Sequence, residues 1–112
     1  MNAGTVITLH SLHSIHRVKA EDILLIHCDS SICDVVLLSG QVILVSKPLN
    51  YFESILSVSW LVRINRSDLV NFNHIVEIRK EGTRKKTCVL SNGKCLPISY
   101  RKWSALKELI NN

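Results

Sequence analysis

The segment RINRSDLVN, residues 63–71, gathers side chains that can recognise a planar hydrogen-bonding partner. An arginine guanidinium can donate two parallel hydrogen bonds, for example to O6 and N7 of guanine, whereas an asparagine amide fits N6 and N7 of adenine. Each such pair discriminates against a wrong base by roughly 1–3 kcal/mol. Arg63, Asn65 and Arg66 supply these groups, and the hydroxyl of Ser67 is suited to a phosphate oxygen. The chemistry of the segment is therefore recognition by hydrogen bonds.

The alternation of side chains along a strand decides whether these groups can reach a partner. A strand over WLVRIN, residues 60–65, places Arg63 and Asn65 on the same face. We expect both side chains to leave the core together, and Arg66 and Ser67 to lie where the strand ends. The segment is thus predicted to present its polar groups outward.

The same residues also have a structural interpretation. Arg66 can pair with the carboxylate of Asp68 or Glu77, and Asn71 can cap the turn. Polar residues at strand ends often satisfy backbone groups in this way. The sequence leaves both interpretations open.

Positive charge is concentrated in the second half of the 112-residue chain. Residues 63–112 carry eleven basic and four acidic side chains, whereas residues 1–62 carry three basic and five acidic. Clustered Lys and Arg gain free energy by releasing the counterions condensed on nucleic acid. The imbalance indicates either a polyanionic partner or a basic surface kept for solubility.

One basic run flanks a predicted tight turn. Its members are Arg79, Lys80, Arg84, Lys85 and Lys86. These side chains can touch phosphates, but charge at a hairpin tip more often protects an exposed sheet edge from aggregation. We therefore expect a protective role for this run.

Composition is that of one globular domain, which we expect to span residues 1–112, with 46% hydrophobic and 21% charged residues. The longest apolar runs, such as VVLL at 35–38, are far shorter than the roughly 20 residues of a membrane-spanning helix. The start, MNAGTVITLH, lacks the basic residues and long apolar stretch of a secretory signal, so a cytoplasmic location is predicted. The four cysteines are then expected to be free thiols.

Catalytic and metal-binding patterns are weak. The cysteines lack the two-residue spacings of a zinc site. His10, His13 and His16 fall in two predicted strands and their turn, which scatters the rings. His27 and Cys28 are adjacent on a strand and point to opposite faces, so they cannot act as base and nucleophile. We expect no metal, no cofactor and no enzymatic activity.

Short apolar segments rich in β-branched residues alternate with polar turns, which predicts an antiparallel β fold. The expected strands are 5–10, 15–18, 23–28, 34–39, 41–46, 60–64, 73–80, 85–91 and 94–99. Asn92 and Gly93 suit a tight hairpin turn. Pro97 must lie on a sheet edge or at a strand end, because it has no amide hydrogen for a ladder.

Two helices are expected beside these strands. Residues 47–56 form a short helix that begins near Pro48, and residues 101–110 form an amphipathic helix at the C-terminal end. The side chains predicted to face inward are Leu49, Phe52, Ile55 and Leu56 in the first helix and Trp103, Leu106 and Ile110 in the second. Each helix is expected to cover part of a sheet.

Three stretches together resemble the LytTR DNA-binding domain family. RINRSDLVNFNHIVEI, residues 63–78, contains an Arg-x-x-Arg-Ser corner, an LVN step and an Asn-His-Ile strand. LSNGKCLPISYRKWSALKEL, residues 90–109, contains a Ser-Asn-Gly turn that leads into a Leu-Pro strand. EDILLIHCDSS, residues 21–31, resembles the early strand of the family and its following loop. The likeness covers nearly the whole chain.

The resemblance implies a mostly β, elongated domain of several antiparallel sheets with a short mid-chain helix and a C-terminal helix. Such domains bind double-stranded DNA through loops, with side chains from three places entering successive major grooves or holding the flanking phosphates. Those places are the loop after the second main strand, the Arg-Ser corner and the segment after the Leu-Pro strand. On this sequence they comprise Ser30 and Ser31; Arg63, Asn65, Arg66 and Ser67; and Tyr100, Arg101 and Lys102.

The resemblance further implies a transcriptional regulator that acts at paired direct repeats, with a second copy or another regulator as partner. Members usually follow a receiver domain, and none is expected within residues 1–112. Asn65, Asp68 and Tyr100 depart from the family pattern, which commonly has a histidine, an aromatic residue and an arginine at these positions. The alternative is a protein-interaction module or anti-activator that keeps the fold, without base-specific contacts, and binds another regulator through a sheet edge or apolar patches.

Overall fold

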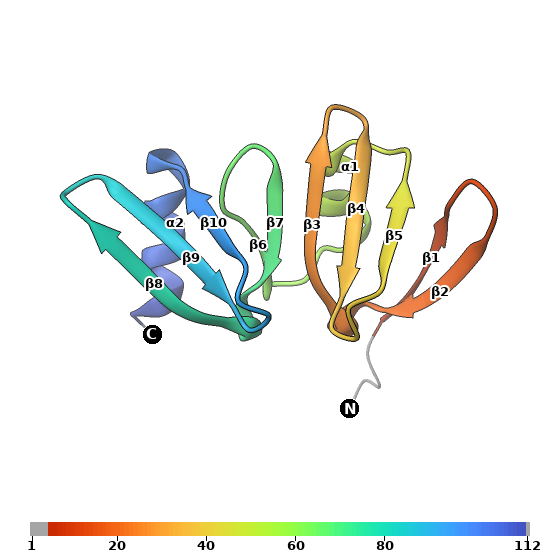
Figure 1. The fold of residues 1–112 in the computed structure, drawn as a ribbon, viewed down its shortest axis with the longest axis horizontal. Coiled ribbons are helices and arrows are strands. Elements are labelled where there is room, and N and C mark those ends of the chain that lie inside the picture. Colours follow the sequence, from red (N-terminus) through yellow and green to blue (C-terminus); the bar gives the residue numbers. More distant parts are fainter. Residues whose placement is uncertain (1–4, 112) are drawn as a thin grey trace.

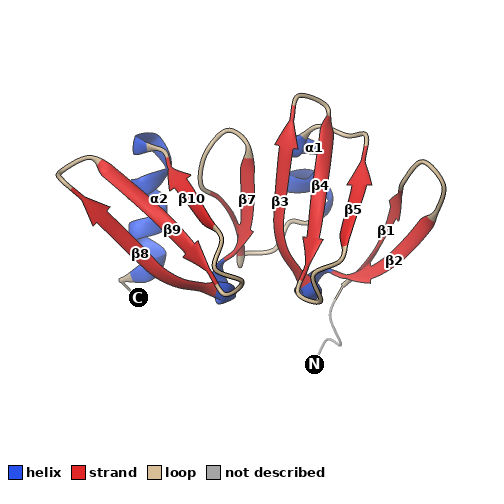
Figure 2. Cartoon of the chain, in the orientation of Figure 1, coloured by secondary structure: helices blue, strands red, loops and turns tan. Residues whose placement is uncertain are grey.

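The computed structural model describes residues 5–111, which fold mainly into antiparallel strands (Figures 1 and 2). The first half contains β1 (Val6–His10), β2 (Ile15–Lys19), β3 (Ile23–Asp29), β4 (Ile32–Leu37), β5 (Val42–Val45) and α1 (Leu49–Ile55). The second half contains β6 (Leu61–Arg63), β7 (Asp68–Asn71), β8 (Ile75–Glu81), β9 (Lys85–Leu90), β10 (Cys95–Ile98) and α2 (Tyr100–Ile110). The predicted mostly β fold with two helices is confirmed. The ends of the predicted domain, residues 1–4 and 112, lie outside the described part.

The described strands form three sheets, in the orders β1-β2, β5-β4-β3-β7-β6 and β10-β9-β8. Every neighbouring pair is antiparallel. The molecule measures 45 × 36 × 24 Å, which agrees with the expected elongated shape. Pro97 lies in β10, an edge strand, as its missing amide hydrogen requires.

Strand β3 joins two apolar cores because it is covered on both faces. Ile23 and Ile26 belong to the first core, which α1 closes with Leu49 and Phe52. Leu25 belongs to the second core, which connects the five-stranded sheet to the three-stranded sheet and α2. The continuous run ILLI is typical of a strand buried on both faces. Strand β3 therefore contributes side chains to both cores and connects the two halves of the molecule.

Strand β7 was not predicted. Its sequence, DLVN, has polar residues at both ends, yet all four residues are buried between β3 and β6. Asp68 and Asn71 can lie there because their side chains are hydrogen-bonded inside the protein. The hydrophobic pattern did not predict β7 because two of its four buried residues are polar.

The two helices occur as predicted, but one residue of each is more exposed than expected. On α1, Leu49 and Phe52 project within about 60° of each other at 100° per residue, and the C-cap residue Leu56 is buried, whereas Ile55 lies about 120° from Leu49 and is 38% exposed. On α2, Ile110 is the last helical residue, is 40% exposed and borders a hollow beside Phe72. The predictions for these two isoleucines are wrong.

The structure joins Cys28 and Cys33 by a disulfide. The two residues face each other across the β3–β4 hairpin, and residues directly opposite on antiparallel strands have neighbouring side chains. The prediction of free thiols is therefore wrong for this pair. Cys88 and Cys95 are free thiols, as predicted, the first buried and the second exposed.

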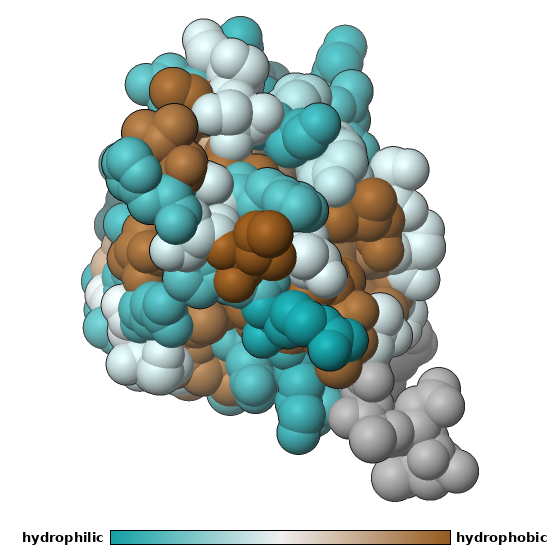
Figure 3. All heavy atoms as spheres, turned by 90° about the vertical axis from the view of Figure 1, so that its right-hand side faces the viewer, coloured by the Kyte–Doolittle hydropathy of each residue, from teal (hydrophilic) through white to brown (hydrophobic). Residues whose placement is uncertain are grey.

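The end of the molecule formed by β1, β2 and β5 carries apolar side chains among polar ones (Figure 3). Its exposed apolar residues include Val6, Ile15, Val42 and Leu44. Polar groups separate them over much of this face, so the surface is mixed rather than uniformly apolar. No helix within residues 5–111 is long and apolar enough to cross a membrane.

Candidate nucleic-acid interface

Three loops predicted to contact DNA lie along one edge of the molecule. The β3–β4 loop, the β6–β7 loop and the start of α2 are all at the upper edge in Figure 1. These segments are far apart in the sequence, and the antiparallel order of their strands turns each of them toward this edge. The fold therefore brings together the three places that the sequence singled out.

Two adjoining hollows open at this edge and share Arg63 and Arg66. The first, about 600 Å³, lies between the β3–β4 loop and the start of α1, and Ser30 and Ser67 line it. The second, about 460 Å³, lies between the β6–β7 loop and the start of α2. Arg66 thus lines both hollows; the first also contains Ser30, Ser67 and the acidic Asp29, and the second contains Arg101 and Lys102.

The second hollow contains the basic start of α2. Arg101 and Lys102 line it, and both residues are exposed. Ser99 caps the helix, because its hydroxyl oxygen accepts a hydrogen bond from the amide of Lys102 at 3.2 Å. The first turn holds no acidic residue. Two cations near the positive end of the helix dipole oppose that dipole, so a bound anion would stabilise this turn.

Arg63 holds the backbone of the corner, residues 64–67, between β6 and β7. Its guanidinium donates to the carbonyl oxygens of Asn65 at 2.9 Å and Arg66 at 2.7 Å. It also forms an ion pair with Glu53 of α1 at 2.6 Å. The expected outward base contact of Arg63 would require breaking these interactions, which connect the corner to α1.

Asn65 is buried rather than outward-facing. Its amide nitrogen donates to Asp68 Oδ2 at 2.9 Å and to the carbonyl oxygen of Pro97 at 2.7 Å, and its amide oxygen accepts from the backbone of Ser67 at 2.7 Å. All of its strong hydrogen-bonding groups are therefore used within the protein. The predicted alternation is wrong here, because the chain leaves strand geometry at Arg63, where β6 ends.

Arg66 is the exposed arginine of the corner. Its side chain takes part in no ion pair within residues 5–111. The carboxylates that could have neutralised it have other partners: Asp68 bonds His27 and Asn65, and Glu77 pairs with Arg79 at 3.3 Å. The structural interpretation of Arg66 is therefore wrong, while that of Asn71 is confirmed, since its side chain accepts from the amide of Asn73.

A family model of the LytTr DNA-binding domain matches residues 13–111 of this chain. The chain belongs to the LytTr DNA-binding domain family. A solved structure, the LytTr DNA-binding domain of a protein described as a methyl-accepting/DNA response regulator from Bacillus cereus, has the same fold. It is 22% identical, with a TM-score of 0.82, and the similarity covers 98% of this chain and 100% of the other. No curated protein matches.

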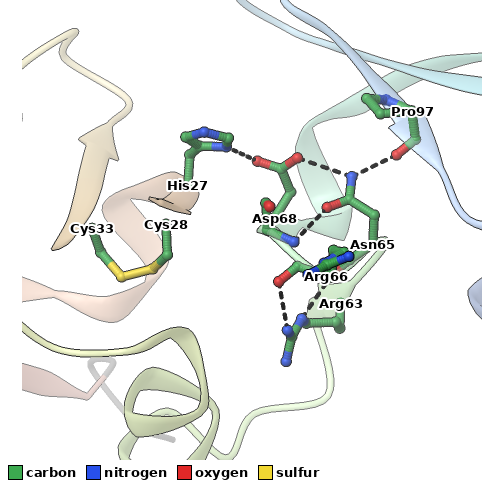
Figure 4. A network of polar contacts seen from close by, with 9 residues as sticks. His27, Cys28, Cys33, Arg63, Asn65, Arg66, Asp68 and Pro97 are labelled. Atoms are coloured by element: carbon green, nitrogen blue, oxygen red, sulfur yellow. Dashed lines mark hydrogen bonds and ion pairs between the residues drawn. A yellow bond between two sulfur atoms is a disulfide. The ribbon is translucent and has the colours of Figure 1, made fainter. Parts of the chain in front are cut away.

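In this LytTr domain, two of the departures from the family pattern contact each other. Asn65 and Asp68 are both buried and share a hydrogen bond, and Asp68 Oδ1 also lies 2.6 Å from His27 Nδ1 (Figure 4). Spacing in the sequence did not reveal this pairing. The third departure, Tyr100, is 74% exposed, borders neither hollow and lies 5.6 Å beneath the guanidinium of Arg84. Ser31 is exposed in its loop but also borders neither hollow.

The basic run of this LytTr domain flanks the β8–β9 turn, and most of its charges have partners. Lys85 pairs with Glu81 at 3.3 Å, and Arg79 pairs with Glu77. Lys86 is buried; its ammonium donates to the Thr83 carbonyl oxygen at 3.1 Å and lies 5.2 Å from the Trp103 ring centre. The basic hairpin, residues 79–86, is thus engaged with its own surroundings.

The free thiol Cys88 lies beneath the corner, in the second core. Burial, together with the negative charges of Asp68 and Cys95, raises the pKa of this thiol to about 11. A thiol with this pKa keeps its proton at neutral pH and is a poor nucleophile. No group of three or more His, Cys, Asp or Glu residues within 5–111 is arranged to hold a metal.

Proposed function

We propose that this LytTr domain is a sequence-specific, double-stranded DNA-binding transcriptional regulator in which Arg66 reads a guanine in the major groove. The observation that carries the proposal is an exposed, unpaired guanidinium on a corner whose backbone is held by Arg63 and Asn65. The planar guanidinium fork can make two parallel hydrogen bonds to a base edge, and the held backbone fixes the point from which the side chain extends. Recognition of this kind requires no cofactor.

The neighbouring residues hold the DNA backbone. Ser67 and Ser30 line the first hollow beside Arg66 and supply hydroxyls for phosphate oxygens, with Ser31 next to them in the β3–β4 loop. Arg101 and Lys102 line the second hollow, where their charges and the start of α2 favour a second phosphate. The two hollows adjoin, so one duplex can engage both.

The operator follows from the family resemblance and is part of the proposal. We expect paired direct repeats, each occupied by one copy of the domain or by another regulator. The exposed Tyr100 is the first residue of α2 and is available to the flanking DNA backbone, although its ring already packs against Arg84.

Selection of bound sequences from a random DNA pool, followed by titration of the selected site and a shuffled site, tests the proposal. Wild type should prefer the selected site, and the affinity for both should fall steeply with salt. Arg66→Ala should reduce the preference by about 1–3 kcal/mol, or roughly 5- to 150-fold. Equal affinity for both sites, unchanged by Arg66→Ala, would rule out base recognition by this corner.

The argument for the protein-interaction alternative is weakened. It relied on three unusual residues at the expected contact surface; Asn65 and Asp68 are buried and bonded to each other, whereas Tyr100 is exposed. A stoichiometric protein partner, together with no retardation of DNA at low salt, would restore it.

A further inference from the structure

We propose that His27, Asp68 and Asn65 form a positioning relay that holds Arg66 in its reading geometry and thereby sets the specificity of this domain. The proposal rests on the function given above, since it assigns the residues that position the base-reading side chain. None of the three is proposed to touch DNA; they act through the corner.

The relay is a continuous chain of side-chain hydrogen bonds (Figure 4). His27 of β3 donates from Nδ1 to Asp68 Oδ1 at 2.6 Å, because an ionised carboxylate can only accept. Asp68 Oδ2 accepts from the amide of Asn65 at 2.9 Å, and the same amide donates to the Pro97 carbonyl oxygen. The chain therefore runs from β3 through β7 and the corner to β10.

Backbone hydrogen bonds run beside the relay on both sides of the corner. The amide of Cys28 donates to the Ser67 carbonyl oxygen, and the amide of Ser99 donates to the Ile64 carbonyl oxygen, each at 2.8 Å. The first bond fixes the corner to the strand that carries the Ser30 loop, and the second fixes it to the start of α2. The relay thus lies at the junction of the β3–β4 loop, the corner and the start of α2, which are the three segments predicted to contact DNA.

Burial makes the part of the relay formed by Asp68 and Asn65 costly to break. Asp68 is 3% exposed and Asn65 is 8% exposed. A buried carboxylate or amide that loses its partner keeps the full cost of desolvation. Replacing Asp68 alone by an aromatic residue, as is common in the family, would remove the acceptor of the buried Asn65 amide, so Asp68 and Asn65 are coupled.

Asp68→Asn tests the relay with almost no change of shape. An asparagine offers one acceptor oxygen where the carboxylate offers two, and its nitrogen only donates. Either one bond is lost, or the bond to His27 reverses and both remaining bonds lose the strength that the carboxylate charge gives them. We expect the preference for the selected site over the shuffled site to fall by at least about tenfold, as for a loosened base contact. Affinity for the shuffled site should stay equal or rise, because a negative charge is removed.

Glu77→Gln is the matched control, since it removes one exposed carboxylate from β8 and leaves the relay intact. If Asp68 acts only through its charge, Asp68→Asn will strengthen binding to both sites equally and keep their ratio, as the control does. That result would overturn the proposal.

His27 provides a second pair of variants that spares the buried residues, because its side chain is 44% exposed. His27→Asn keeps a nitrogen donor near the position of Nδ1 and should retain the preference, whereas His27→Ala should lose it. Melting temperatures identify any variant that fails to fold. Equal loss in both variants, or loss in neither, would contradict a role for this hydrogen bond.

Amide hydrogen exchange in the free protein tests the relay without DNA. The backbone amide of Ser67 donates a hydrogen bond to Asn65 Oδ1. In Asp68→Asn, this amide should exchange its hydrogen about tenfold faster, while the exchange rate of the Leu90 amide in β9 should not change. If the Ser67 amide is protected from exchange equally in Asp68→Asn and in wild type, the relay is overturned. This readout uses no DNA, so it remains decisive even if wild type shows no sequence preference. Preference abolished by Arg66→Ala but kept in Asp68→Asn and His27→Ala would overturn the relay while leaving the proposed function standing.

Discussion

The corner and the basic hairpin are both arginine-bearing and lie in the same half of the chain, yet they differ in what their charges already bind. Arg66 at the corner is exposed and unpaired within the described residues, and Arg101 and Lys102 line the hollow next to it. In the basic hairpin, Arg79 and Lys85 have carboxylate partners and Lys86 is buried. Net charge counts both regions equally, whereas the structure separates a region free to bind from one engaged with its own fold.

Pairing alone does not remove the hairpin from consideration. An exposed ion pair is worth only about 0–1 kcal/mol, so a phosphate can displace it. However, no residue of the basic hairpin lines either of the two hollows that contain Arg66. We therefore expect it to add long-range attraction for DNA and to contribute little to the choice of sequence.

The largest expected difference between the regions comes from changing the shape of a cation while keeping its charge. Arg66→Lys should cost about 1–3 kcal/mol in preference for the selected site, because a lysine cannot make the paired hydrogen bonds of the guanidinium fork. Arg84→Lys in the basic hairpin is the matched control and should leave the preference unchanged. Fluorescence anisotropy titrations with both DNA sites measure this; equal effects of the two variants would erase the distinction.

A smaller and sequence-independent effect is expected at the start of α2. Lys102→Ala should weaken binding to selected and shuffled sites alike and reduce the slope of log K against log salt by about 1, as expected for one lost phosphate contact. Lys85→Ala, whose lysine already pairs with Glu81, should change the slope less. Titrations at several salt concentrations compare them, and a larger change for Lys85→Ala would reverse the assignment.

Lys86 should matter for stability rather than for DNA. Lys86→Ala removes a buried stem, a hydrogen bond to Thr83 and the contact with the Trp103 ring, so the free energy of unfolding should fall by about 1 kcal/mol. Urea unfolding measures this loss. Reduced sequence preference in a variant of unchanged stability would show that Lys86 belongs to the interface after all.

The smallest effect is expected at Lys80, which is exposed in β8 and has no ion pair within residues 5–111. Either the lack of an ion-pair partner or the position beside the hollows could explain the proposed DNA contact of Arg66. Lys80 distinguishes the two, because it is unpaired like Arg66 but lines neither hollow. Lys80→Ala should change affinity for the selected site by less than about 0.5 kcal/mol. A loss as large as that of Arg66→Ala would mean that lack of a partner, and not position, decides binding.

Hydrophobic patterning predicted most of the fold because the strands and both helices carry their apolar residues at regular spacing. It failed at β7 and at Asn65, where polar residues are buried and satisfied by partners such as Ile23, Pro97 and Ser67. Such partners lie up to 50 positions away in the sequence. Periodicity reports average burial and carries no information on which distant group will accept a hydrogen bond.

The candidate site was predicted only in part, because the sequence does not show which of its polar side chains have partners inside the protein. Arg66 could be singled out by residue type and by the family resemblance, and the structure places it exposed at the edge where the predicted loops meet. Arg63 has the same chemistry and lies three residues earlier, yet its guanidinium holds the corner. The disulfide between Cys28 and Cys33 likewise depended on the register of a hairpin that spacing does not fix. Residue type supplied the candidates, and the backbone path decided among them.

The most direct measurement of the central claim combines one protein variant with one altered base. Each guanine of the selected site is replaced in turn by 7-deazaguanine, which lacks the N7 acceptor. At one position the replacement should weaken wild-type binding by about 1–3 kcal/mol and have no further effect on Arg66→Ala, because both changes remove the same hydrogen bond. Losses that add at every position would show that the Arg66 guanidinium does not read a guanine.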